Sequence, residues 1–278
     1  MTEIVAHHGI FRDTHLHVED SGDTGRPVVL LHGWPLSSAT WRHQVPALVA
    51  AEYRAVTYDR RGFGQSDKPT TGYTYDTLAE DLHTLILDLE LFDVTLVGFS
   101  MGGGEVARYC ANFGTERLHS VVFASAVTPY MLETRSNPEG PLTKTKAVEM
   151  AAALAADDRG FYDEFTREFF SVNGKIAVSE AERQRARKLC SVADKRAALG
   201  CLAAFGATDF RDDLAAVDVP ALVLHGDSDA TVPFEGSGRR THAAIAGSTL
   251  HLIADAPHGC NVSHAEEFNR VLIGFLDA

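Results

Sequence analysis

The sequence has no long uninterrupted apolar run, and none approaches the ~18 residues expected of a transmembrane helix. The first residues, MTEIVAHHGIFRD, carry charges and no apolar segment, so we expect no signal peptide. Basic residues are in the minority, with 25 Lys and Arg against 38 Asp and Glu, which gives a formal charge of −13. Such a surface repels phosphate backbones and anionic membranes, so we expect neither nucleic acid nor a membrane as a partner.

Cysteine is also scarce, and the few cysteines show no CxxC spacing, which argues against a disulfide framework or a zinc site. We interpret them as reduced core residues of a cytoplasmic protein, with a reactive thiol at Cys260 as the alternative. The four are Cys110, Cys190, Cys201 and Cys260.

Histidines gather at His7-His8 and at His15-Leu16-His17, where His15 and His17 would share one face of a strand. No carboxylate or cysteine set completes a ligand group around them. We therefore expect no metal, and no cofactor is indicated elsewhere.

Short apolar runs alternate with helical patterns, which is typical of an α/β fold with a mostly parallel sheet and right-handed crossovers. Leucines at 78, 82, 85 and 89 mark one face of a helix over 75–91. Further helices are expected from Met101 onward and over 266–276. Strands are expected at 28–31, 54–58, 94–97, 121–124, 221–224 and 249–253.

The alternation stops after Thr128-Pro129 and resumes near residue 221. From about 141 to 210 the chain is rich in Ala, Glu and Arg, has a helical pattern and shows no strand-like run. This pattern predicts a sheet domain, over 1–128 and 213–278, that is interrupted by a helical cap over 129–212.

The segment GFSMG at 98–102 fits G-x-S-x-G and stands between a strand and a helix, the context that this motif requires. Glycines at 98 and 102 remove the Cβ atoms that would collide in so sharp a turn. The glycines explain the tight turn, but the turn itself does not require a serine at its apex. Ser100 is therefore the candidate nucleophile.

A serine hydroxyl needs a base to take its proton. Among thirteen histidines we choose His258, because it follows the last strand and so lies at the same sheet edge as Ser100. The nearby His264 falls at the start of the closing helix, where it would cap the helix or face solvent. A carboxylate should orient the base. Asp227 and Asp229 both follow the preceding strand, and the residues alone do not separate them.

Two backbone N–H groups could hold the negative charge that develops on the substrate oxygen, one at Trp34 in HGWPLSSATW and one at Met101. His32 in the same stretch is better explained as a hydrogen-bond partner of the loop backbone than as a proton carrier. The segment DRRGFGQSD at 59–67 lacks the lysine-serine ending of a phosphate loop, so we expect a turn that shapes the sheet edge.

Together HGWPLSSATW, DRRGFGQSD, VGFSMGGGEVARY, LHGDSDATVPFE and DAPHG resemble the α/β-hydrolase superfamily. More narrowly, they are similar to bacterial aryl esterases and cofactor-free haloperoxidases (perhydrolases), a group that also includes some γ-lactamases. The resemblance implies Asp229 as the acid, with Ser100 and His258, and the N–H groups of Trp34 and Met101 as oxyanion donors. It also implies a small-molecule ester substrate, with water or hydrogen peroxide as the second reactant.

Many perhydrolases of this group carry a proline after the oxyanion tryptophan, as Pro35 does here. Its fixed φ could move a loop carbonyl toward the acyl intermediate, where it would accept a hydrogen bond from peroxide. The alternative is that Pro35 only stiffens the loop. The pocket residues expected under the cap are Trp34, Phe99, Val127, Phe205 and Val232.

Two other functions stay open at this level. The same groups could open a lactam or lactone ring, and some proteins of this fold are ligand receptors rather than enzymes. Haloalkane dehalogenase and epoxide hydrolase chemistry is disfavoured, because both need an aspartate where Ser100 stands. The sequence does not decide the subunit number and leaves a homo-oligomer open.

Overall fold

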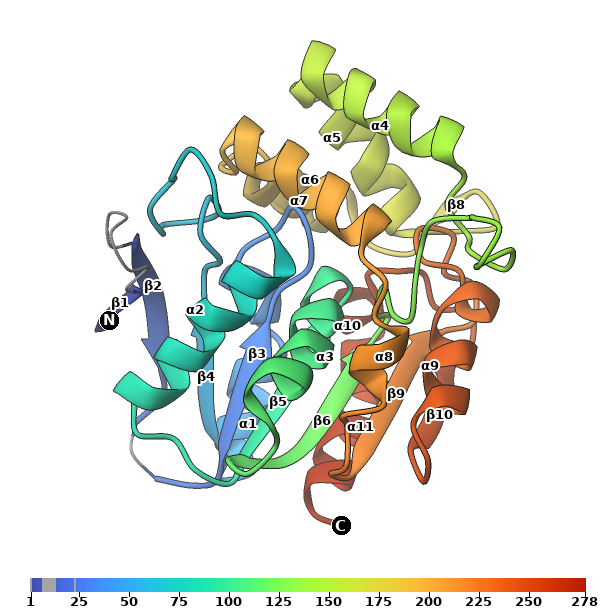
Figure 1. Ribbon diagram of the computed structural model, residues 1–278. Coiled ribbons are helices and arrows are strands. Elements are labelled where there is room, and N and C mark those ends of the chain that lie inside the picture. The colour runs from blue at the N-terminus through green and yellow to red at the C-terminus, as the bar shows by residue number, and fades with distance from the viewer. Residues whose placement is uncertain (1, 7–13, 23) are drawn as a thin grey trace.

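A computed structural model describes residues 2–6, 14–22 and 24–278 (Figure 1). In these ranges the chain forms an eight-stranded sheet in the order β1-β2-β4-β3-β5-β6-β9-β10. β1 and β2 pair antiparallel, β2 runs antiparallel to β4, and the other neighbours are parallel. The strands are β1 (Thr2–Ala6), β2 (Thr14–Asp20), β3 (Pro27–Leu31), β4 (Arg54–Tyr58), β5 (Val94–Phe99), β6 (Leu118–Ala124), β9 (Ala221–Gly226) and β10 (Thr249–Ile253). The expected α/β fold is confirmed.

The central strands form where apolar runs are covered on both faces. Every residue of β5 and of β9 is buried, as expected for parallel strands under two helical layers. Helices α2 (Tyr75–Asp88), α3 (Met101–Phe113) and α8 (Arg211–Leu214) lie on one face of the sheet (Figure 1). On the other face lie α1 (Gln44–Ala50) and the closing helix α11 (Ala265–Leu276). Two short helices, α9 (Gly238–Ala244) and α10 (Cys260–Ser263), precede β10 and α11.

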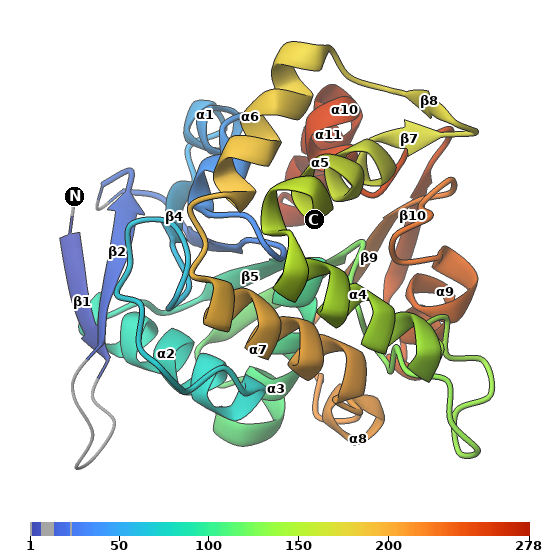
Figure 2. The ribbon, with the colours of Figure 1, turned by 90° about the horizontal axis from the view of Figure 1, so that it is seen from above.

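Four helices lie above the carboxyl ends of the strands (Figures 1 and 2). They are α4 (Lys144–Ala156), α5 (Asp158–Phe169), α6 (Glu180–Cys190) and α7 (Lys195–Ala207). Viewed from above, α4 and α7 run side by side across the middle of the sheet edge (Figure 2). These helices form the cap. The domain boundaries given from the sequence stay a prediction.

The expectation that the segment 141–210 holds no strand is wrong in one place. β7 (Ser171–Val172) and β8 (Lys175–Ile176) form a short antiparallel hairpin between α5 and α6. Asn173 and Gly174 turn the chain with φ of 49° and 78°, the left-handed conformation that an Asn-Gly turn favours. Strands of two residues are too short to show an alternating pattern, so the Asn-Gly pair was their only sequence signal.

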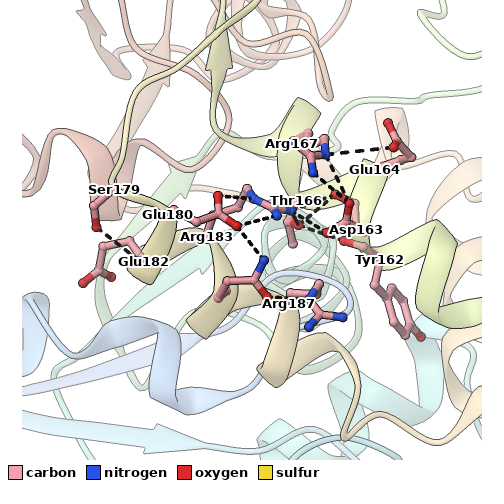
Figure 3. A network of polar contacts seen from close by, with 11 residues as sticks. Tyr162, Asp163, Glu164, Thr166, Arg167, Ser179, Glu180, Glu182, Arg183 and Arg187 are labelled. Carbon is pink, nitrogen blue, oxygen red and sulfur yellow. Dashed lines mark hydrogen bonds and ion pairs between the residues drawn. The ribbon is translucent and has the colours of Figure 1, made fainter.

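A buried arginine joins two of the cap helices (Figure 3). Arg183 on α6 is 2% exposed and donates from Nη1 to Asp163 Oδ1 of α5 at 2.8 Å. The same guanidinium donates to both carboxylate oxygens of Glu180, at 2.9 and 2.7 Å, and to Thr166 Oγ1 at 3.2 Å. A buried cation whose three nitrogens all donate hydrogen bonds orients α6 against α5.

The cap is tied to the sheet domain by bonds from two loops that follow strands. The Trp34 indole donates from Nε1 to the carbonyl of Ala198 in α7 at 2.9 Å. The Asp194 N–H, at the start of α7, donates to the carbonyl of Gly62 at 2.8 Å. Gly62 belongs to the segment 59–67, which forms a turn after β4 and opens no helix, as expected. The cap therefore rests directly on the loop that holds Trp34.

In the described part of the chain, no helix has both the length and the apolar character needed to cross a bilayer. The four cysteines are free and buried. Burial raises the pKa of the Cys260 thiol to about 12, which does not favour a reactive thiolate.

His15 bonds the carboxylate of Asp67 at 2.9 Å, and His17 lies 2.9 Å from the Gln65 side chain. Among the described residues no group of three or more possible metal ligands comes together. His7 and His8 lie outside the described residues.

Candidate active site

The turn between β5 and α3 presents Ser100 at the carboxyl edge of the sheet. Ser100 has φ 55° and ψ −116°, a strained backbone conformation for a residue with a side chain. A Cβ on Gly98 would lie 2.5 Å from the Gly102 carbonyl oxygen, and one on Gly102 would lie 2.6 Å from the Leu31 carbonyl oxygen. Only glycine fits at either position, so the sequence GFSMG is what allows this turn.

Three side chains from distant segments meet at this turn. His258 Nε2 lies 2.9 Å from Ser100 Oγ, and His258 Nδ1 lies 2.6 Å from Asp229 Oδ2. All three residues are buried, with exposed fractions of 6% for Ser100, 5% for Asp229 and 1% for His258. Since the carboxylate accepts from Nδ1–H, the lone pair of Nε2 faces the serine hydroxyl.

The Asp229 carboxylate accepts hydrogen bonds at both oxygens. Oδ1 accepts from the N–H groups of Thr231 and Val232, at 3.0 and 2.7 Å, while Oδ2 faces His258 and a second histidine, His225, at 3.3 Å. Burial alone would raise the pKa of Asp229, but the neighbouring His258 and the hydrogen bonds from both imidazoles hold this pKa well below its usual range. The carboxylate is therefore ionised.

Asp227 and His264, the other candidates for the acid and the base, do not contact Ser100 or His258 in the described contacts. Asp227 is exposed and accepts a hydrogen bond from the Ser228 hydroxyl at 2.9 Å. His264 stands at the N-terminus of α11, as expected there, and its Nδ1 lies 2.9 Å from Ser263 Oγ without capping the helix. The structure thus brings Asp229 and His258 to Ser100.

Two backbone segments flank the serine where a substrate oxygen would lie. Met101 is the first residue of α3, so its N–H has no carbonyl partner within the helix. The Tyr75 hydroxyl donates to the Met101 carbonyl at 3.2 Å and fixes this helix start. On the other side, Gly33, Trp34 and Pro35 form a turn closed by the Leu36 N–H on the Gly33 carbonyl at 3.0 Å, and the Trp34-Pro35 peptide bond is cis.

His32 holds this turn from behind. Its Nε2 accepts from the Arg60 N–H at 3.0 Å, so Nδ1 carries the proton and donates to the Gly33 carbonyl at 2.9 Å. Arg60 also bonds the His32 carbonyl at 2.7 Å and forms a buried ion pair with Glu105. Burial and the Arg60 charge lower the pKa of His32 well below its usual value. His32 is thus a neutral partner of the loop backbone, as expected from the sequence.

The lowered pKa of His32 predicts a loss of stability in acid. Below about pH 6.5, His32 binds a proton in the unfolded chain but stays neutral in the folded chain. As the pH is lowered, His32 therefore reduces the free energy of unfolding by at most about 1.4 kcal/mol per pH unit. Above about pH 6.5, the contribution of His32 to the free energy of unfolding is fully present. His32→Asn keeps a donor near the Nδ1 position but does not titrate. We expect urea unfolding of this variant to depend less on pH between 7 and 5, and equal slopes for both proteins would contradict this.

A chamber of about 50 Å³ lies over Ser100 and His258. Of the expected pocket residues, Trp34, Val127, Phe205 and Val232 line it. Phe99 does not, because it is the last residue of β5 and packs behind the site, with its ring centroid 5.2 Å from that of His258. Sequence reasoning missed the remaining wall, which is formed by Met131, Leu142, Met150, Phe165 and Thr231.

A second, larger cavity of about 430 Å³ adjoins this chamber and shares those same five residues with it. Its other walls come mainly from α4 and α5, and they carry Lys146, Glu149, Glu164 and Glu168. The smaller cavity contacts Ser100, and the larger one lies between the cap helices α4 and α5 and the smaller cavity. We call them the inner and the outer chamber.

The fold and the site together define a class. A mainly parallel sheet with a serine on a strained strand-to-helix turn, followed along the chain by an aspartate and a histidine, is the arrangement of an α/β hydrolase. The family model described as alpha/beta hydrolase fold matches residues 26–265.

Comparison with known proteins indicates a group within the α/β hydrolases to which the chain is similar. A bromoperoxidase from Bacillus anthracis has a solved structure with a TM-score of 0.96 and 48% identity, covering 100% of this chain and 99% of that one. A non-heme chloroperoxidase of Kitasatospora aureofaciens is 39% identical over 256 residues, 91% of this chain and 93% of the relative. A bifunctional esterase/perhydrolase of Acinetobacter calcoaceticus is 34% identical over 261 residues, 93% and 94% of the two chains. The chain belongs to the α/β hydrolase family, in the group of non-heme haloperoxidases and esterase/perhydrolases, which confirms the resemblance seen in its motifs.

Proposed function

We propose that the protein is a serine hydrolase that cleaves small carboxylic esters through an acyl-enzyme. The observation that carries this proposal is the continuous chain of contacts from Ser100 Oγ through the imidazole of His258 to Asp229, at 2.9 and 2.6 Å. Such a chain has the geometry of a nucleophile, its base and the acid that orients the base.

In the proposed cycle Ser100 Oγ attacks the ester carbonyl while His258 Nε2 accepts its proton. The N–H groups of Trp34 and Met101 hold the oxyanion, and losing one such donor typically costs about 3–4 kcal/mol of transition-state stabilisation. His258 then protonates the leaving alcohol and leaves the acyl group on Ser100. Water then gives a proton to His258 and attacks the acyl carbon. The bond from Ser100 Oγ to that carbon breaks, His258 returns the proton to Oγ, and the acid leaves. Every proton has a protein group assigned to it, so the cycle requires no cofactor.

Hydrogen peroxide can replace water in the last step. It would attack the acyl carbon, pass one proton to His258 and leave as a peracid, which oxidises a halide in solution to hypohalous acid while it is reduced to the carboxylic acid. The printed names of the relatives, haloperoxidase and esterase/perhydrolase, support this second reaction. Pro35 follows the proposed oxyanion donor Trp34, as in many perhydrolases of the group.

The two chambers suggest which part of the ester lies where. The inner chamber around Ser100 has a volume of about 50 Å³, which is enough for only a small group of atoms. A short acyl chain therefore suits the inner chamber. The alcohol would lie in the outer chamber, from which it can leave while water or peroxide enters. The exposed carboxylates of Glu149, Glu164 and Glu168 do not favour an anionic alcohol there.

We expect p-nitrophenyl acetate to give an initial burst of nitrophenol when acyl release is the slow step, followed by steady turnover. Peroxide added at constant ester should divert the acyl group to peracetic acid, measured by bromide oxidation. A protein that retains a small ligand tightly but cleaves no ester, lactone or lactam would instead be a receptor. Turnover of lactams or lactones without turnover of esters would assign ring opening as the reaction.

A further inference from the structure

A second buried histidine contacts the carboxylate that orients His258. His225 is the fifth residue of β9, four positions before Asp229, and its side chain is fully buried. Its Nε2 lies 2.9 Å from the Val232 carbonyl oxygen and 3.3 Å from Asp229 Oδ2. Both neighbours are acceptors, so Nε2 carries the proton and shares it between them. Nδ1 of His225 has no hydrogen-bond partner in the described structure.

The packing around His225 fixes the ring in this orientation. A Cβ on Gly238, the first residue of α9, would lie 2.6 Å from His225 Nδ1, so only a glycine leaves room for the imidazole. The Phe234 ring stands edge-on to the imidazole, with centroids 5.6 Å apart. The ring is therefore held with Nε2 toward the loop 229–232, which carries the acid.

Asp229 receives four donors, and only two of them come from side chains. The N–H groups of Thr231 and Val232 hold Oδ1 and belong to the backbone, whereas Oδ2 faces the two histidines. His225 Nε2 and His258 Nδ1 contact the same oxygen, at 3.3 and 2.6 Å. The donor from His225 fixes where Oδ2 points and helps to keep the buried carboxylate ionised, since hydrogen bonds to the charged form favour that form.

We propose that His225 is a positioning residue for the reaction, acting through Asp229 on the tautomer and orientation of His258. This inference rests on the proposed function, because it requires His258 to act as the base. The ionisable groups around Asp229 are His225, His258 and the buried Cys260 thiol, and of these only the two histidines bond its carboxylate.

Three variants at one position separate this role from simple packing. Glutamine places an amide donor close to the Nε2 position, asparagine places one closer to Nδ1, and leucine has none. We expect His225→Leu and His225→Asn to lower kcat on the order of 10-fold, the loss typical of one hydrogen bond to a charged group, with little change in KM. His225→Gln should recover most of the rate.

The pH dependence of kcat/KM provides a second test, because a loss of packing alone would not shift it. Without the His225 donor, more of the Asp229 charge acts on His258, so the acidic limb of kcat/KM should move to higher pH, by up to about one unit, in His225→Leu and His225→Asn. It should stay in place in His225→Gln. Equal losses in all three variants with an unmoved profile, or wild-type kcat in all three, would overturn the proposal.

A measurement on the unaltered protein keeps the proposal testable even if the variants fold poorly. In ¹⁵N-labelled wild-type protein at neutral pH, His225 should carry its proton on Nε2, with Nδ1 bare. A proton on Nδ1 with a bare Nε2 would overturn the proposal whatever the enzyme activity. Conversely, wild-type protein that turns over no ester, with the Nε2–H tautomer present, would contradict the proposed function rather than the hydrogen bond.

Discussion

Replacing Ser100 with alanine is expected to reduce turnover of p-nitrophenyl acetate by roughly 10⁴-fold or more and to abolish the burst of nitrophenol. The reason is that, among the described contacts, the hydroxyl that His258 Nε2 bonds is that of Ser100, at 2.9 Å. The turn itself should persist, because alanine carries the same Cβ. Circular dichroism and thermal unfolding should therefore match the wild-type protein.

Ser125 offers a matched control for this change. It also follows a central strand at the same sheet edge, is fully buried and has a positive φ of 43°, but its hydroxyl faces the Cys260 thiol at 3.6 Å rather than His258. Ser125→Ala should retain turnover within a few-fold of wild type. Ester cleavage at the wild-type rate by Ser100→Ala would show that another group is the nucleophile.

Replacing Asp229 with asparagine is expected to lower kcat by about 10⁴-fold, with a smaller effect on KM. An amide nitrogen facing His258 cannot accept from Nδ1–H, so the imidazole would turn to the tautomer that carries its proton on Nε2. That nitrogen could then no longer take the proton of Ser100. Steady-state kinetics with p-nitrophenyl acetate would measure the loss.

Asp227→Asn is the control, because this exposed acid lies two positions away and bonds only Ser228 in the described contacts. It should leave kcat nearly unchanged. If the two variants lost the same activity, or if Asp227→Asn lost more, Asp229 would not be the acid that orients His258.

The central part of this fold could be predicted because its signals are local. The strands over 54–58 and 249–253 have the predicted bounds. In the first of them, a run with four buried residues ends sharply at a polar turn. Ser100 could be located for the same reason, since GFSMG contains the glycines that its turn requires. β2 was harder to find, because its apolar residues are interrupted by His15, which is exposed, and by His17, which is buried.

The rest of the site depends on contacts between distant segments. Asp227 and Asp229 both follow β9, and what separates them is the turn in which the N–H groups of Thr231 and Val232 hold one oxygen of Asp229. The chamber wall from Met131 to Phe165 depends on how the cap helices pack, which no short pattern encodes. His225 could only be suspected as a histidine inside an otherwise apolar strand, four positions before the acid.

The most direct test of the account is covalent labelling with diethyl p-nitrophenyl phosphate, which leaves a stable phosphoryl group on an activated serine. The account predicts that one diethylphosphoryl group per chain accompanies complete loss of esterase activity, that it maps to the peptide containing Ser100, and that Asp229→Asn reacts far more slowly. Inactivation with the label on a different residue, or full activity after Ser100 has been labelled, would contradict it.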